Sequence, residues 1–545
     1  MMKRSRMKPP TLALASVLLA SCGGDAGTRV GDKEAVGKAP EGEKPEDRTP
    51  EVKTPEAEPP VVKAPTPDGL KPVPLPEWVG FPAAPGELQA AIDARDPAPL
   101  RQHAWRLFAG INQRISAEDP RPLWWTWSTT TQLFEQPAGP PTLTAMTGHR
   151  HMARALAAAA VARPPAPGTP DPDRDHTDEC VDANNNGVIF YAGPTYVLPM
   201  ATVKRFGLDP RCADPTYFLA NTDACALKDG THFQSNGDIL VATESYSEPG
   251  ADRIETLRYN EAATLQGLLA AGTKVLPRLA TQQVTTKHMY WPVKARGRSA
   301  LPVFREPPRD RWCQYNGYEG WADLIAVEPG GAGGKGAVDF LFGVYDSAGK
   351  KVLPTRHATV DVHPLDEFYA QQIDQARWDA LDVKDQMMLD AASQWAHGKP
   401  FEPGDHVVTV AMHIITREIP QWTLQSAWWS DLPDAGPYAA DRPELPRAQG
   451  PWRHYLMTVE DGITREPGGA ALPVAFNPFI ELAATHPVAT NCRNCHIRAS
   501  WPTSSYLTGT GPGPLANIGV DDEIFAGLLL TDFQWVIADR VKASK

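Results

Sequence analysis

Hydrophobic residues along the chain follow a helical spacing first and a strand spacing later. Between Asp96 and Ile111 the large apolar residues Leu100, Trp105, Leu107, Phe108 and Ile111 fall on one side of a helical pattern, which predicts a helix that begins at Asp96. Two more helices are expected over residues 153–162 and 378–395. The aromatic run at residues 122–127 is expected to lie in the core.

From Gly187 onward the apolar spacing changes toward a period of two, which is typical of strands. The expected strands are residues 188–191, 238–243, 284–293, 321–326, 337–345, 357–362 and 406–416. A glycine-rich run at residues 330–334 is expected to be the loose loop of a hairpin between two of them. This order predicts an α+β fold with a body rich in antiparallel β-sheet and flanking helices.

The N-terminal residues have the pattern of an export signal, with positive charges over residues 3–8 and an apolar run over 12–20. The segment Leu19-Ala20-Ser21-Cys22-Gly23 resembles the lipobox of bacterial lipoproteins. The resemblance implies cleavage before Cys22, lipid on the Cys22 sulfur, and sorting to the outer membrane because glycine follows. An ordinary secretory signal is the alternative. No later stretch has the ~18 consecutive apolar residues that a spanning helix needs.

The domain organisation follows from a change in composition. Residues 1–21 are the expected signal peptide, and residues 22–77 are rich in Pro and Glu with almost no large apolar side chains, which predicts a disordered tether. The globular region is expected over residues 78–545, as one body or as subdomains of 78–400 and 401–545. The formal net charge of the 545-residue chain is −12. This charge argues against a nucleic-acid partner, because phosphate binding needs a basic face.

The segment Cys492-Arg493-Asn494-Cys495-His496 is the attachment signature of c-type haem. Cys492 and Cys495 would each bind a haem vinyl group, and His496 would reach the iron as its proximal ligand. Because haem c is attached outside the cytoplasm, the export signal supports this interpretation. A zinc site, which needs two more ligands, and a redox dithiol, which does not explain the histidine, are the alternatives. The motif predicts one covalently bound haem c.

The sixth iron ligand, if the chain supplies one, is expected from upstream, because no methionine, histidine or cysteine follows His496. Met412 and His413 lie next to each other on the strongest predicted strand, so their side chains point to opposite faces and only one can face the haem. These two residues are the leading distal candidates. Other candidates are His288, Met289, His454 and Met457.

Charged residues near the motif and elsewhere allow further predictions. Arg493 and Arg498 flank the haem cysteines, where they would pair with the haem propionates or lie as solvated surface charges. An EF-hand loop that starts at Asp182 needs an acidic residue at its twelfth position, which is Gly193. We therefore expect a solvated turn there, with calcium as the alternative.

The remaining cysteines are even in number and would lie in an oxidising compartment, which predicts two disulfides. Their spacing leaves all three pairings open. These cysteines are Cys180, Cys212, Cys225 and Cys313.

Short segments across residues 100–540 resemble a bacterial family of large proteins with one c-haem motif near the C-terminus. The matching segments are residues 103–112, 125–127, 259–263, 412–416 with Trp422, and 531–535. The order of Asn260, the strands at 284–293 and 407–416, Trp422 and the motif is also similar to sheet-rich c-haem proteins. These include cytochrome c′-beta and the lysine-cross-linked hydroxylamine-oxidising cytochromes. The second resemblance implies an open or weakly filled distal site, although no cross-linking lysine is assigned here.

Three functions are consistent with these features. The first is extracytoplasmic electron transfer by a membrane-tethered monohaem cytochrome with a redox partner protein. The second is a haem enzyme or gas-binding protein that acts on a small nitrogen or oxygen species. The third is a surface binding protein in which the haem is structural. A histidine or methionine that faces the iron favours the first function, and a distal side without such a ligand favours the second.

Overall fold

The computed structural model describes residues 71–134, 198–214, 217, 225, 241–306, 321, 323–341, 356–381, 383–461, 472–480, 490–502, 512–513 and 515–541. The chain divides into two units, residues 1–62 and 63–545, and every described residue belongs to the second. The predicted signal peptide, Cys22, the helix over 153–162, the strand over 188–191 and the Asp182 loop lie outside the described residues.

The described helices lie within residues 87–205, 248–397 and 492–540. They are α1 (Glu87–Asp93), α2 (Pro97–Ile111), α3 (Thr130–Phe134), α5 (Met200–Arg205), α7 (Glu248–Thr256), α8 (Ala262–Ala270), α9 (Gln375–Ala380), α10 (Val383–His397), α11 (Cys492–Ile497) and α12 (Trp535–Arg540). The helix predicted from Asp96 is confirmed as α2. The Asp96 carboxylate accepts a hydrogen bond from the Ala98 amide at 3.1 Å, which caps the first turn.

Most strands belong to one antiparallel sheet. The strands are β1 (Ser128–Thr129), β2 (Val241–Tyr246), β3 (Val284–Val293), β4 (Ser299–Val303), β5 (Asp323–Glu328), β6 (Lys335–Phe340), β7 (Arg356–Pro364), β8 (Ala370–Gln372), β9 (His406–Thr416), β10 (Thr423–Trp429), β11 (Tyr455–Asp461), β12 (Ser500–Trp501) and β13 (Leu529–Leu530). Seven of them form a sheet in the order β1-β2-β3-β9-β10-β11, with β8 beside β9. The predicted α+β fold with a sheet-rich body is therefore confirmed.

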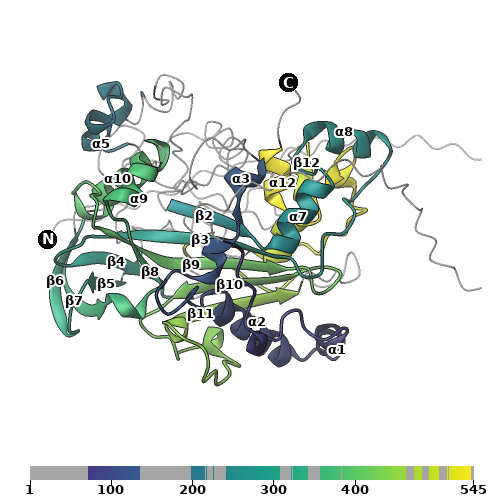
Figure 1. Ribbon diagram of the computed structural model, residues 1–545, viewed down its shortest axis with the longest axis horizontal. Coiled ribbons are helices and arrows are strands. Elements are labelled where there is room, and N and C mark those ends of the chain that lie inside the picture. The colour runs from purple at the N-terminus through teal and green to yellow at the C-terminus, as the bar shows by residue number, and fades with distance from the viewer. Residues whose placement is uncertain are drawn as a thin grey trace, which may run out of the picture. The chain divides into compact units, whose positions relative to one another are not determined.

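The seven-stranded sheet joins segments that are far apart in the chain. β3 pairs with β9 along its whole length, so the sheet contains strands from both sides of residue 400. Figure 1 shows α1 and α2 on one side of this sheet, and α7, α8, α10 and α12 on the other. Apolar side chains on both sides are buried, and the largest fully buried ones include Trp105, Trp291 and Trp428. Trp124 and Trp127 are each 3% exposed, which confirms the predicted core position of the aromatic run.

The smaller four-stranded sheet corrects one prediction. Its order is β4-β5-β7-β6, so β5 and β6 are not partners in a hairpin. β7 lies between them and pairs antiparallel with β6 and parallel with β5. The glycines at 330–334 connect two strands that each find a partner in β7, a pairing that local sequence does not encode.

The single helix predicted over residues 378–395 is wrong. Two helices, α9 and α10, replace it, because Leu381 has extended backbone dihedrals that end α9. The Gln386 side chain donates hydrogen bonds to the carbonyl oxygens of Trp378 at 2.9 Å and Leu381 at 3.4 Å. These bonds satisfy backbone acceptors that the end of α9 leaves open. Across the described part of the chain, no helix has the length and hydrophobicity needed to cross a membrane.

Candidate haem site

The haem motif lies on the short helix α11. Asn491 caps this helix, since its side-chain oxygen accepts a hydrogen bond from the Asn494 amide at 3.1 Å. Helix geometry places residues i, i+3 and i+4 on one face, so Cys492, Cys495 and His496 share a face. Both cysteines are half-buried. The fold therefore presents two thiols and an imidazole together.

The imidazole of His496 is held by a backbone carbonyl from the end of the fold. The distance from His496 Nδ1 to the carbonyl oxygen of Phe533 is 2.8 Å. A carbonyl oxygen only accepts, so Nδ1 carries the proton and donates. In the neutral ring, Nε2 then keeps its lone pair, and this is the atom that can bind a metal. The residues of the motif thus have the protonation pattern that a proximal haem ligand needs.

The two arginines of the motif bind protein groups. Arg493 is fully buried and donates to the carbonyl oxygen of Ile518 at 2.6 Å. Arg498 is 6% exposed and donates to the Asn494 side chain at 3.0 Å and to the carbonyl oxygen of Pro512 at 3.0 Å. The alternative of solvated surface charges is therefore wrong. Both guanidinium groups fix α11 to the segment that follows it, and pairing with haem propionates stays a prediction.

The helix α11 lies against one particular face of the seven-stranded sheet. Cys492 packs on a hydrophobic cluster that includes Tyr246, Ile415 and Leu424. These three side chains come from β2, β9 and β10, and the pairing register places them on the same face. We call this the motif face. Its central row of paired residues is Glu244, Lys287, His413, Ser426 and Thr458.

Three residues of the central row of the motif face are exposed in part. Lys287 is the one residue of β3 that is not buried, and His413 is the one in the interior of β9. Glu244, which pairs with Lys287, is also half-buried, and its Oε2 accepts a hydrogen bond from the Thr130 hydroxyl at 2.8 Å. Three titratable side chains on adjacent strands therefore lie in line at the partly open part of an otherwise buried sheet.

Residues 475–477 connect this row to the motif. The Cys492 thiol lies 3.6 Å from the carbonyl oxygen of Ala475. Two residues later, the Asn477 amide donates to the Ser426 hydroxyl at 2.8 Å, and Ser426 pairs directly with His413. The motif and His413 thus share one face of the sheet, a few side chains apart.

Met412 points the other way. Its sulfur lies 3.7 Å from the Asn112 amide nitrogen at the end of α2, and the residue is fully buried. We call this side the α2 face. Its central row is Thr243, His288, Met412, Ala427 and Met457. Because the α2 face is opposite the motif, the geometry leaves His413 as the candidate of the pair that faces the motif.

The other distal candidates do not combine the motif face with exposure. His288 and Met457 belong to the α2 face, whereas Met289 lies on the motif face, two residues from Lys287, and is 1% exposed. His454 lies in the 3-10 helix η10 (Trp452–His454), with Nδ1 at 3.6 Å from a Glu367 carboxylate oxygen. His413 is therefore the candidate that combines the motif face with access to solvent.

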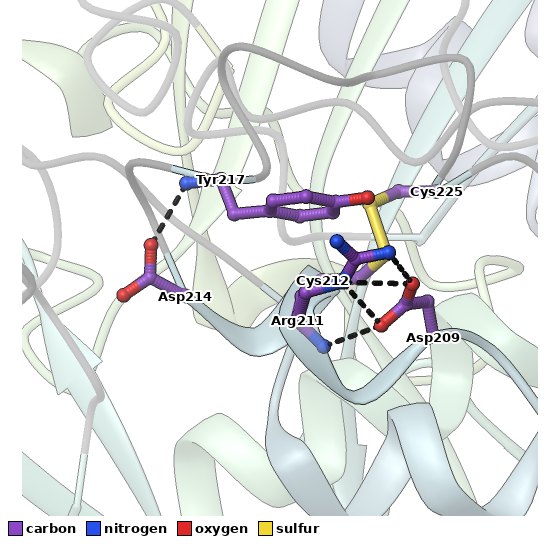
Figure 2. Close-up of a disulfide and its surroundings, with 6 residues drawn as sticks. All are labelled: Asp209, Arg211, Cys212, Asp214, Tyr217 and Cys225. Carbon is purple, nitrogen blue, oxygen red and sulfur yellow. Dashed lines mark hydrogen bonds and ion pairs between the residues drawn. A yellow bond between two sulfur atoms is a disulfide. The ribbon is translucent and has the colours of Figure 1, made fainter.

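One predicted disulfide is present among the described residues, between Cys212 and Cys225 (Figure 2). Beside it the Arg211 guanidinium lies 4.4 Å from the centre of the Tyr217 ring and pairs with Asp209. Cys180 and Cys313 lie outside the described residues. Within the described ranges, no three His, Cys, Asp or Glu side chains come together as a metal-ligand group.

Glu244, Lys287 and the Phe533 carbonyl were not among the site groups that the sequence predicts. The first two gain meaning only from the pairing of β2, β3 and β9. The third is a backbone atom, which no residue type reveals. Comparisons of the chain with protein-family models, with curated proteins and with solved structures found no match.

Proposed function

We propose that this protein is a monohaem c-type cytochrome, with the haem attached to Cys492 and Cys495 and its iron bound by His496. The observation that carries the proposal is the 2.8 Å hydrogen bond from His496 Nδ1 to the Phe533 carbonyl oxygen, which puts the proton of the neutral ring on Nδ1 and the lone pair on Nε2. A haem c in this place supplies an iron that changes between ferrous and ferric states. The cysteines anchor the group, and the turn at Phe533 orients its ligand.

Electron transfer is the function that the geometry supports best. His413 lies on the motif face and is half-exposed within a buried strand, so it is the leading source of a sixth ligand. An iron with two protein ligands exchanges electrons without binding a substrate. The proposed partner is a redox protein, with lipid on Cys22 and residues 22–77 holding the globular region at the outer membrane.

A second candidate function is supported by the charges beside His413. Glu244 and Lys287 are half-buried and paired across adjacent strands of the motif face. If His413 does not bind the iron, these groups could hold and orient a small nitrogen or oxygen species. The protein would then be a haem enzyme or gas-binding protein with an open distal site.

The first prediction tests attachment. Replacing Cys492 and Cys495 by alanine should abolish the c-type pyridine haemochrome and leave no haem with the protein after acid-acetone extraction. The matched control is His357→Ala, because His357 is 74% exposed, pairs with Asp339 on the smaller sheet, and should not change haem content. Unchanged haem in the double variant would overturn the proposal. In wild type, rapid carbon monoxide binding by the ferrous form would favour the second candidate function over the first.

A further inference from the structure

The carbonyl that binds His496 belongs to a turn with an unusual backbone. Asp532 and Phe533 follow each other with φ values of 48° and 67°, in the left-handed region that residues with a side chain rarely occupy. The turn is closed by the Gln534 amide, which donates to the carbonyl oxygen of Thr531 at 3.0 Å. Each such residue costs on the order of 1–3 kcal/mol, so the surrounding structure must hold the turn in place.

The side chain of Asp532 supplies much of that hold. Its carboxylate is 5% exposed and accepts hydrogen bonds from Arg417 Nε at 3.1 Å and from Trp422 Nε1 at 3.2 Å. It also accepts from the Leu279 amide at 3.3 Å. These donors come from the segment between β9 and β10 and from the segment before β3, so they adjoin the ends of three strands of the sheet.

Trp422 and Arg417 are fixed in turn. Trp422 is fully buried with a φ of 68°, and the Arg417 guanidinium lies 5.4 Å from the centre of its ring. Arg417 also donates to the carbonyl oxygen of Ile419 at 2.6 Å. The carboxylate of Asp532 is therefore held by two buried groups that cannot easily follow it if the turn moves.

We propose that Asp532 is a positioning residue for His496. By fixing the turn at residues 531–534, Asp532 directs the Phe533 carbonyl at Nδ1, keeps the Nδ1–H form of the ring, and raises the basicity of Nε2. The effect on iron rests on the proposed haem function, whereas the effect on the imidazole does not. A more basic ligand stabilises ferric over ferrous iron, so Asp532 favours the oxidised state.

The test compares Asp532→Asn with Asp405→Asn in the full chain. Asp405 is a matched control because it is 3% exposed, pairs with Lys294, and accepts from the amides of Ala295 at 2.8 Å and Glu402 at 2.9 Å. Both variants should lose stability. Only Asp532→Asn should lower the ferric-to-ferrous ratio at a fixed ambient potential, by about tenfold. Trp422→Phe removes one donor to Asp532 and keeps an aromatic ring, so it should lower the ferric-to-ferrous ratio by a smaller factor. It replaces Asp532→Asn in the test if that variant does not fold.

A second arm does not depend on haem. In the full chain with Cys492→Ser and Cys495→Ser, ¹⁵N NMR of histidine should show the Nδ1–H form of His496, and Asp532→Asn should add the Nε2–H form. An unchanged tautomer and an unchanged ferric-to-ferrous ratio would overturn the inference. If the parent protein contains no covalent haem, the proposed function fails, and the tautomer alone decides the role of Asp532.

Discussion

On the α2 face of the seven-stranded sheet the polar side chains of β2 and β3 are buried and bond to one another, whereas on the motif face Glu244, Lys287 and His413 are half-exposed. His288 stacks on Trp124 with ring centres 3.6 Å apart, and its Nδ1 lies 3.2 Å from the Thr243 hydroxyl. One residue before it in β3, Lys287 reaches solvent on the opposite side. The strands β2, β3 and β9 thus bury their side chains on the α2 face and expose some polar side chains on the motif face.

This difference shows how one strand can carry core residues on one face and candidate site residues on the other. Because successive side chains point to opposite faces, a single step along β9 goes from Met412 in the core to His413 beside the motif. Burial lowers the pKa of His288 to about 3, so its ring stays neutral inside the α2 face.

The largest expected effect separates Met412 from His413. Met412→Ala should destabilise the protein by about 2–5 kcal/mol, because it removes a buried side chain from the core, and it should leave the haem spectrum unchanged. His413→Ala should cost less than about 1 kcal/mol and should alter the ferrous spectrum or speed carbon monoxide binding. Urea unfolding and absorption spectra check both. If Met412→Ala alters the spectrum and His413→Ala does not, then Met412, and not His413, faces the motif.

A pH titration of stability sharpens the comparison further. The pKa of His288 is about 3 in the folded protein, below the ordinary value of 6.5, so between these values the unfolded chain binds a proton that the folded protein does not. His288 should therefore lower the free energy of unfolding by about 1.4 kcal/mol for each pH unit from 6.5 down to about 3. Above pH 6.5 the ring is neutral in both states, so its stabilising contribution is complete. Burial also lowers the pKa of His397, to about 4, which adds a slope of the same sign.

The control for this titration is His288→Phe. Phenylalanine keeps a ring against Trp124, and the Thr243 hydroxyl keeps its Tyr290 partner at 2.9 Å. Urea unfolding of the variant between pH 6.5 and 5 should show a slope smaller by about 1.4 kcal/mol per pH unit. If the free energy of unfolding has the same slope against pH in both proteins, then burial does not keep the His288 ring neutral.

The smallest effects are expected from neighbours on β2. Thr243→Val on the α2 face removes a buried hydroxyl between His288 and Tyr290, which should cost about 1–3 kcal/mol. Glu244→Gln on the motif face should cost less than about 1 kcal/mol, because the amide oxygen can still accept from Thr130. A larger loss in Glu244→Gln would indicate that the motif face is as closed as the α2 face.

Local patterns predicted some elements well and others not at all. The strand at 406–416 and the start of α2 match the structure, because a run rich in β-branched residues and a capping aspartate are local signals. β10 was missed because its apolar and polar residues do not alternate and Thr423 is its one β-branched residue. β11, which pairs with β10 along one edge, was also missed.

The candidate site divides in the same way. The motif at 492–496 can be found from its spacing, and the opposition of Met412 and His413 follows from strand geometry. The row of Glu244 and Lys287 needs the register of three strands, and the role of Asp532 needs a turn whose carbonyl points at His496. Both features join residues that are far apart in the chain, so no short segment of the sequence can reveal them.

The order of the strands along the chain has a consequence for synthesis. β3 ends at Val293 and β9, its partner, begins at His406, so the centre of the sheet is a long-range pairing of the kind that folds slowly. β11, the last strand of the sheet, ends at Asp461, before the motif is reached. Every strand of that sheet therefore precedes the cysteines in the chain, whereas His496 gains its Phe533 partner only after 37 more residues have followed. The contact that fixes the imidazole of His496 therefore cannot form until nearly all of the chain has been made.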